Sequence, residues 1–231
     1  MNTFAMGCEK MKKALLLLAA ILMIQSSCLA ASVQQLPSAE KTDLRQYQQA
    51  QGTLNVIAAP FDGAQMYIGA FNFGRQEDSS AVTFSRGIAL MNPESGKMYP
   101  LLIKKVSGTS SCFSEQLINK DGTEPYKQSS KTVQTDSAVP IAYIGDDADS
   151  VVLTGRFAVN TAGGSFSDCI GVKIYSSKTG EGLIQYLAKG HGIVYLEGVR
   201  ADGSTAPIAE LHEIKTMDDA AAADFAQQYF K

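Results

Sequence analysis

Tryptophan is absent from this chain of 231 residues, and histidine occurs only as His191 and His212. Neither histidine belongs to an HExxH motif or stands at zinc-binding distance from another ligand residue. The Gly-x-Ser-x-Gly nucleophile elbow is also missing. The glycine-rich pieces at 180–182 and 190–192 lack the rest of a phosphate-binding loop, so turns and bulges explain them better. The sequence therefore predicts no enzyme, no cofactor and no metal site.

Long apolar runs are scarce as well. The longest one near the N-terminus, Ala14–Ile24, is about half of the roughly twenty residues that span a bilayer. It follows the basic segment 11–13 and precedes a polar patch and the small residues Cys28 and Ala30. This order of basic, apolar and small residues is typical of a signal peptide. We therefore expect residues 1–30 to be a signal peptide and the rest to work outside the cytoplasm, in the periplasm or beyond the cell.

The processing site leaves alternatives open. Cleavage after Ala30 or Ala31 fits the small residues there, and translation could begin at Met1 or at Met11. A lipoprotein signal would instead make Cys28 the acylated residue. Gln25 stands where such a signal usually has an aliphatic side chain, so we expect ordinary cleavage rather than a lipid anchor.

The net charge excludes further classes of partner. The whole chain carries 20 basic and 23 acidic residues, and removing the leader's net +2 from −3 leaves −5. The lysines are scattered and form no basic run. We expect neither a nucleic-acid partner nor a polybasic membrane contact.

Two cysteines, Cys112 and Cys169, remain once the leader is removed. An even pair in an exported protein favours a disulfide. This bridge would close a loop of about 57 residues and stabilise the fold by about 4 kcal/mol in the chain-entropy estimate. The alternative is a pair of buried thiols that act as small apolar side chains.

The domain plan has two parts after the leader. Residues 31–52 are polar and rich in glutamine, and they fit either a short helix ending near Gly52 or a simple tether. Residues 53–231 contain about ten short apolar runs separated by turn signals, of which 92–96 is the clearest. Apolar residues that recur every four positions predict a C-terminal helix at 216–230.

This pattern predicts a mainly β fold. We expect one antiparallel, strongly curved sheet or half-barrel, flanked either by the C-terminal helix alone or by that helix and a short N-terminal helix. The terminal helices are candidates to cover part of the concave side.

Alternation along 166–175 suggests an apolar face. Strands at 183–188 and 192–199 offer further apolar side chains with the same period. The candidate ligand-binding face consists of Phe166, Ile170, Val172, Ile174, Tyr186 and Tyr195.

The C-terminal half also carries a recurrent pattern. Residues 161–169 read T-x-x-G-x-F-x-D-C, residues 186–194 read Y-x-A-x-G-x-G-x-V, and Glu210-Leu211 follows. Over about 155–214 the chain resembles exported bacterial proteins similar to the half-barrels of the LolA and LppX type. The resemblance implies a concave sheet that holds a lipid or another apolar ligand, and it implies no catalytic residues.

Two functions from different classes follow. The first is an envelope binding protein whose concave face takes an apolar small molecule or lipid. The second is a structural or protein-interaction module of the envelope, with a protein partner and no ligand cavity. A filled concave face would favour the second.

Overall fold

Eleven antiparallel strands form one sheet, in the spatial order β1-β7-β8-β9-β10-β11-β2-β3-β4-β5-β6. The computed structural model describes residues 31–37, 42–61, 64–111, 113–118, 120 and 150–231. The mainly β fold with a C-terminal helix is thus confirmed. The strands are β1 (Ser32–Leu36), β2 (Thr53–Phe61), β3 (Ala64–Glu77), β4 (Val82–Met91), β5 (Met98–Gly108), β6 (Phe113–Ile118), β7 (Ser150–Thr161), β8 (Gly164–Tyr175), β9 (Gly182–Ala188), β10 (Gly192–Val199) and β11 (Thr205–Thr216).

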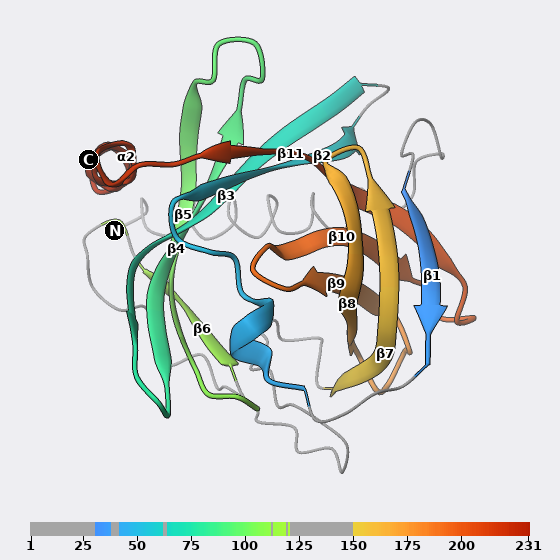
Figure 1. Cartoon of the computed structure of the whole chain (residues 1–231). Helices are drawn as coiled ribbons and strands as arrows, with labels where there is room; N and C mark the ends of the chain where they lie inside the picture. The colour runs from blue at the N-terminus through green and yellow to red at the C-terminus, as the bar shows by residue number, and fades with distance from the viewer. Residues whose placement is uncertain (1–30, 38–41, 62–63, 112, 119, 121–149) are drawn as a thin grey trace, which may run out of the picture.

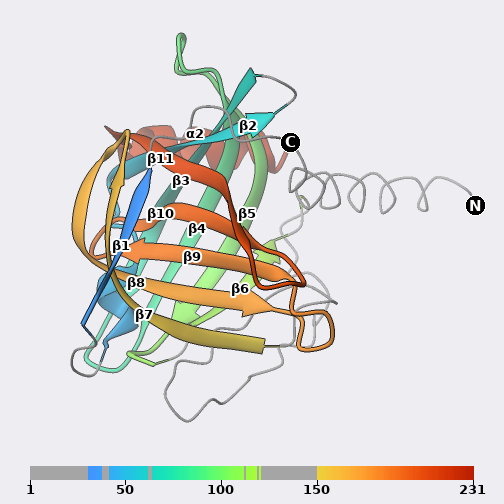
Figure 2. The same cartoon turned by 90° about the vertical axis from the view of Figure 1, so that its right-hand side faces the viewer.

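The sheet curls into a half-barrel. Figures 1 and 2 show the strands wrapping around a central space, with β4, β5 and β6 facing β7 and β8 across it. Strands β1 and β6 stand at the two ends of the order, so the sheet does not close on itself. This curvature follows from the right-handed twist of strands, which makes a large open sheet curl.

The turn between β4 and β5 shows how a few local residues make two consecutive strands pair. The side-chain oxygen of Asn92 accepts hydrogen bonds from the backbone N–H groups of Glu94 and Ser95. Gly96 then takes a φ of 69°, which a side chain would disfavour. The chain reverses here, and β5 pairs back along β4 from Met91↔Met98.

The segment 31–52 does not form the single short helix that was considered for it. Residues 32–36 form β1 and pair with β7, and only Leu44–Tyr47 are helical, as the 3₁₀ helix η2. Asp43 caps η2 by accepting from the backbone N–H of Arg45. In a 3₁₀ helix, side chains three apart lie on the same side. Leu44 and Tyr47, the two buried residues of η2, therefore project together.

The C-terminal helix α2 (Asp219–Tyr229) packs on the convex face of the sheet. Asp218 caps it by accepting from the backbone N–H of Ala221. The ring of Phe225 lies 4.9 Å from that of Phe71 and covers Gly87, where a Cβ atom would meet both rings. Figure 1 shows α2 outside the curve that encloses η2. The helix therefore leaves the concave face uncovered, contrary to its expected role.

Candidate functional site

Strand β4 passes through three zones on the concave face. Its alternate residues Val82 and Phe84 are buried in a core around η2, and Arg86 is charged. Ile88 and Leu90 then continue the same face toward the β4–β5 turn. We call these zones the plug core, the belt and the strip, and each is defined below.

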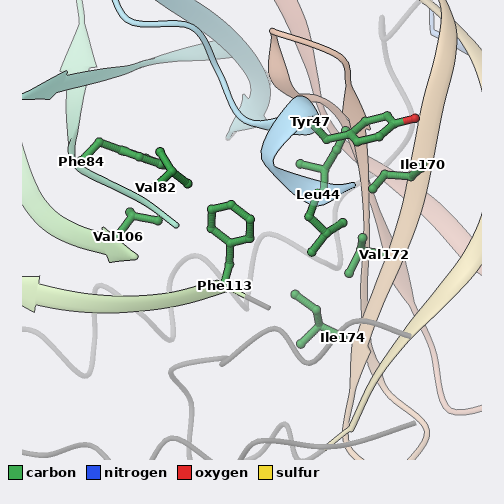
Figure 3. Close-up of a cluster of buried hydrophobic side chains, with 10 residues drawn as sticks. Leu44, Tyr47, Val82, Phe84, Val106, Phe113, Ile170, Val172 and Ile174 are labelled. Atoms are coloured by element: carbon green, nitrogen blue, oxygen red, sulfur yellow. The ribbon is translucent and has the colours of Figure 1, made fainter. Parts of the chain in front are cut away.

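The plug core fills the space between the two halves of the half-barrel. Leu44 and Tyr47 of η2 are each 1% exposed. Figure 3 shows them between strands β4–β6 on one side and β8 on the other. The buried members of the plug core are Leu44, Tyr47, Val82, Phe84, Val106, Phe113, Ile170, Val172, Ile174 and Leu187.

Polar contacts hold η2, which we call the plug, in place. The Tyr47 hydroxyl donates to Asp168 Oδ1 at 3.0 Å and accepts from Arg156 Nη2 at 2.9 Å. Burial, with the neighbouring Asp168 carboxylate, raises the pKa of Tyr47 to about 12, so the phenol stays protonated. Lys189 also pairs with Asp168, at 2.7 Å. The backbone N–H of Leu44 donates to the carbonyl of Ser110. A segment of the chain itself, η2, therefore fills this part of the concave face.

The belt consists of Asn72, Arg86, Lys104 and Glu115. Arg86 Nη1 lies 2.6 Å from Glu115 Oε1, and Lys104 Nζ lies 2.7 Å from Glu115 Oε2. Arg86 Nε donates to Asn72 Oδ1. Strand register places Asn72, Arg86 and Lys104 in one row across β3, β4 and β5. Two cations therefore share one carboxylate just beyond the plug core.

The belt should make stability depend on pH. Burial alone would raise the pKa of Glu115, but the charges of Lys104 and Arg86 outweigh it and lower the pKa to about 2. A lowered pKa stabilises the fold fully above the ordinary value near 4.5, and that stabilisation is lost as the pH falls toward 2.

Between pH 6 and pH 2 we expect Glu115 to contribute a loss of roughly 2–3 kcal/mol in the free energy of unfolding. Urea unfolding at a series of pH values measures it, with Glu115→Gln as the comparison. The variant should be less stable at pH 6 and show a flatter pH profile. Parallel profiles for the two proteins would contradict the assignment.

The strip is a cross-strand row of apolar side chains on the concave face. Ile57 of β2 pairs with Ile68 of β3, Ile68 pairs with Leu90 of β4, and Leu90 pairs with Tyr99 of β5. Leu90 is 37% exposed and Tyr99 is 51% exposed, while both isoleucines are partly buried. An open hollow of about 510 Å³ lies at the Leu90 and Tyr99 end of the strip, where these two side chains line it together with the β4–β5 turn and with Tyr67 and Met91 from the opposite face. An apolar surface thus remains open where the plug ends.

The six residues predicted to form the ligand-binding face do not form one surface. Ile170, Val172 and Ile174 belong to the plug core and are at most 2% exposed. Phe166, Tyr186 and Tyr195 belong to a separate cluster, which contains Cys169 and Ala188. Cys169 pairs with Ala188 and the next residue, Ile170, pairs with Leu187, so the two clusters lie on opposite faces of the sheet.

One β-bulge and the register between β8 and β9 cause this split. From Phe157↔Cys169 to Val159↔Phe166, three steps along β8 match two along β7, which reverses the alternation between Phe166 and Ile170. Tyr186 pairs with Gly171, which lies between Ile170 and Val172, so Tyr186 lies on the face opposite to theirs, and Tyr195 pairs with Tyr186. The prediction that these six residues share one surface is therefore wrong.

The predicted disulfide is not supported. Cys169 is a buried free thiol on β8, and Cys112 lies outside the described residues. The strand that begins after Cys112 is β6, whose neighbour is β5, whereas β8 lies between β7 and β9. Burial and the charge of Asp168 raise the pKa of Cys169 to about 12, so it does not form a reactive thiolate at neutral pH.

Both histidines have aromatic partners. The ring of His191 lies 5.2 Å from that of Phe166, and the ring of His212 lies 5.2 Å from that of Tyr67, both in edge-on geometry. Within the described residues no group of three or more His, Cys, Asp or Glu side chains could hold a metal ion. The helices of this same part of the chain include none with the length and apolarity needed to cross a membrane.

Comparison with known proteins gives distant structural likenesses. No family model matches the chain, and no curated protein matches it. A Parabacteroides distasonis ATCC 8503 protein assigned as a lipoprotein is similar in structure, with 16% identity and a TM-score of 0.47. The match covers 77% of this chain and 100% of that one. A Bacteroides fragilis NCTC 9343 protein assigned as exported, with a YmcC-like fold, has 14% identity and a TM-score of 0.42, covering 72% and 97%.

Proposed function

We propose that the protein is an exported binding protein of the cell envelope, not an enzyme, and that an apolar ligand lies on the strip. The observation that carries this proposal is the open row from Ile57 to Tyr99 on the concave face. The plug core fills the adjoining part of that face, and among the described residues the strip leaves apolar side chains partly exposed. Partly exposed apolar side chains gathered around a hollow favour binding of an apolar group.

Replacing Leu90 with aspartate should weaken the binding of a hydrophobic dye several-fold, because a carboxylate would then lie in the middle of the strip. Dye titration followed by fluorescence measures the effect. Phe230→Asp is the matched control, since Phe230 is 42% exposed but lies at the end of α2. Equal dye binding by the two variants would contradict a site at the strip.

Export predicts a shortened chain. The leader's basic, apolar and small segments support cleavage after Ala30 or Ala31. Fractionation of the native host and N-terminal sequencing should give a mature chain that begins at Ala31 or Ser32 outside the cytoplasm. A mature chain that still begins at Met1 or Met11 would contradict export, and an acylated Cys28 would identify a lipoprotein.

One observation favours the alternative, an interaction module of the envelope with a protein partner. The plug core fills the space between the two halves of the half-barrel, where an enclosed ligand would otherwise lie. This function needs the same exposed residues but no small ligand. Dye binding that depends on Leu90 without any co-purifying small molecule would favour it.

A further inference from the structure

The belt and the strip adjoin on the same face, so charged side chains lie at one end of this surface and apolar side chains lie along the rest. Along β4, Arg86 belongs to the belt, and Ile88 and Leu90 follow at alternate positions. At about 3.3 Å per residue, Leu90 lies roughly 13 Å from Arg86 along the strand. A ligand that spans both zones would meet charge at one end and apolar side chains along the rest.

The belt has an excess of positive charge. Arg86 and Lys104 face the single carboxylate of Glu115, which is ionised at neutral pH because its pKa is about 2. Arg86 is the more buried cation, with its side chain 14% exposed, and three of its five N–H groups already donate, Nη1 to Glu115, Nε to Asn72 and Nη2 to Gln48. Lys104 is 26% exposed and donates to Glu115, and an ammonium group carries three protons. Lys104 is therefore the cation best placed to accept a second anion.

We propose that the strip binds an anionic single-chain amphiphile, with its acidic head group at Lys104 and its chain along Ile88, Ile68 and Leu90 toward Tyr99. This proposal rests on the proposed function and adds the chemistry of the ligand. Charge complementarity selects the anion, because a neutral head group gains no ion pair and a cationic one meets Arg86 and Lys104. Apolar contact along the strip selects the chain.

Isothermal titration of the mature protein with laurate, dodecanol and dodecylamine tests the polarity, since the three share a chain and differ in head-group charge. Laurate can accept a charge-assisted hydrogen bond from Lys104, which the neutral dodecanol cannot match. Laurate should therefore bind at least about tenfold more tightly than dodecanol, and dodecylamine should bind most weakly. Dodecyl phosphate is a further arm of the experiment. If it binds more tightly than laurate, the head group that the site prefers is a phosphate and not a carboxylate.

Variants locate the head group. Lys104→Met should abolish the preference for laurate over dodecanol and leave dodecanol binding unchanged, whereas Lys104→Arg should keep the preference. Lys105→Met is the matched control, because Lys105 is the next residue on β5 and pairs with Ser85 on the other face. Leu90→Asp should weaken both ligands. Thermal melting of each variant checks that it is folded.

The possible failures are distinguishable. Equal binding of laurate and dodecanol by the unsubstituted protein, or an unchanged preference in a folded Lys104→Met variant, would overturn the amphiphile proposal and leave apolar binding intact. Binding of none of the four chains would overturn both the amphiphile proposal and the proposed function.

Discussion

Replacing Phe225 with alanine should lower the free energy of unfolding by about 3–5 kcal/mol. Phe225 is buried between α2 and the sheet, with its ring edge-on to Phe71 at 4.9 Å. The substitution removes this aromatic contact and leaves a cavity above Gly87, which has no side chain to fill it. Urea unfolding followed by far-UV circular dichroism measures the change.

Phe230→Ala provides the control for this result. Phe230 is the residue after the end of α2 and is largely exposed, so its loss should change stability by no more than about 0.5 kcal/mol. A similar cost for both substitutions would mean that α2 does not dock on the convex face through Phe225.

Replacing Leu44 with alanine should cost about 2–5 kcal/mol, a large effect for one residue of a four-residue helix. Leu44 reaches from η2 into the plug core, so its removal leaves a cavity between the two halves of the sheet. Chemical denaturation measures the loss, and a constant m-value would show that the variant still folds to a similarly compact state.

Gln46 offers a matched control within η2, because its side chain is exposed. Gln46→Ala should leave stability within about 0.5 kcal/mol of the original. If Leu44→Ala cost no more than Gln46→Ala, the plug would not be an integral part of the core, and the concave face could not be described as closed there.

Much of the fold follows from local signals. Alternating apolar runs and turn residues such as Asn92 and Gly96 predict a large antiparallel sheet, because each signal acts over a few neighbouring residues. The C-terminal helix was also predictable, since Asp218 caps it and Phe225 and Tyr229 lie on one face. What it packs against depends on strand order, which no local signal specifies.

The plug shows where such reasoning fails. Segment 31–52 has few apolar residues, and Leu44 and Tyr47 look too sparse to mark a core element. They are effective because a 3₁₀ turn aligns them and because Asp168 and Arg156, distant in sequence, bind the Tyr47 hydroxyl. Contacts between residues so far apart in the chain leave no periodic trace.

The prediction of the ligand-binding face was wrong for a different reason. Strict alternation along 166–175 predicts one apolar face, but a bulge between Phe166 and Cys169 reverses it. The strip, in turn, draws its residues from four strands, and each residue looks like an ordinary core residue in its own strand. Its exposure depends on where the plug ends, which becomes visible only in the folded chain.

Native mass spectrometry of the mature protein, purified from its own host without detergent, tests ligand binding at the strip most directly. We predict a bound species heavier than the polypeptide by the mass of one amphiphile, present in the Phe230→Asp variant and absent in Leu90→Asp. A wild-type protein that carries only the polypeptide mass, and stays unliganded after incubation with laurate, would contradict it.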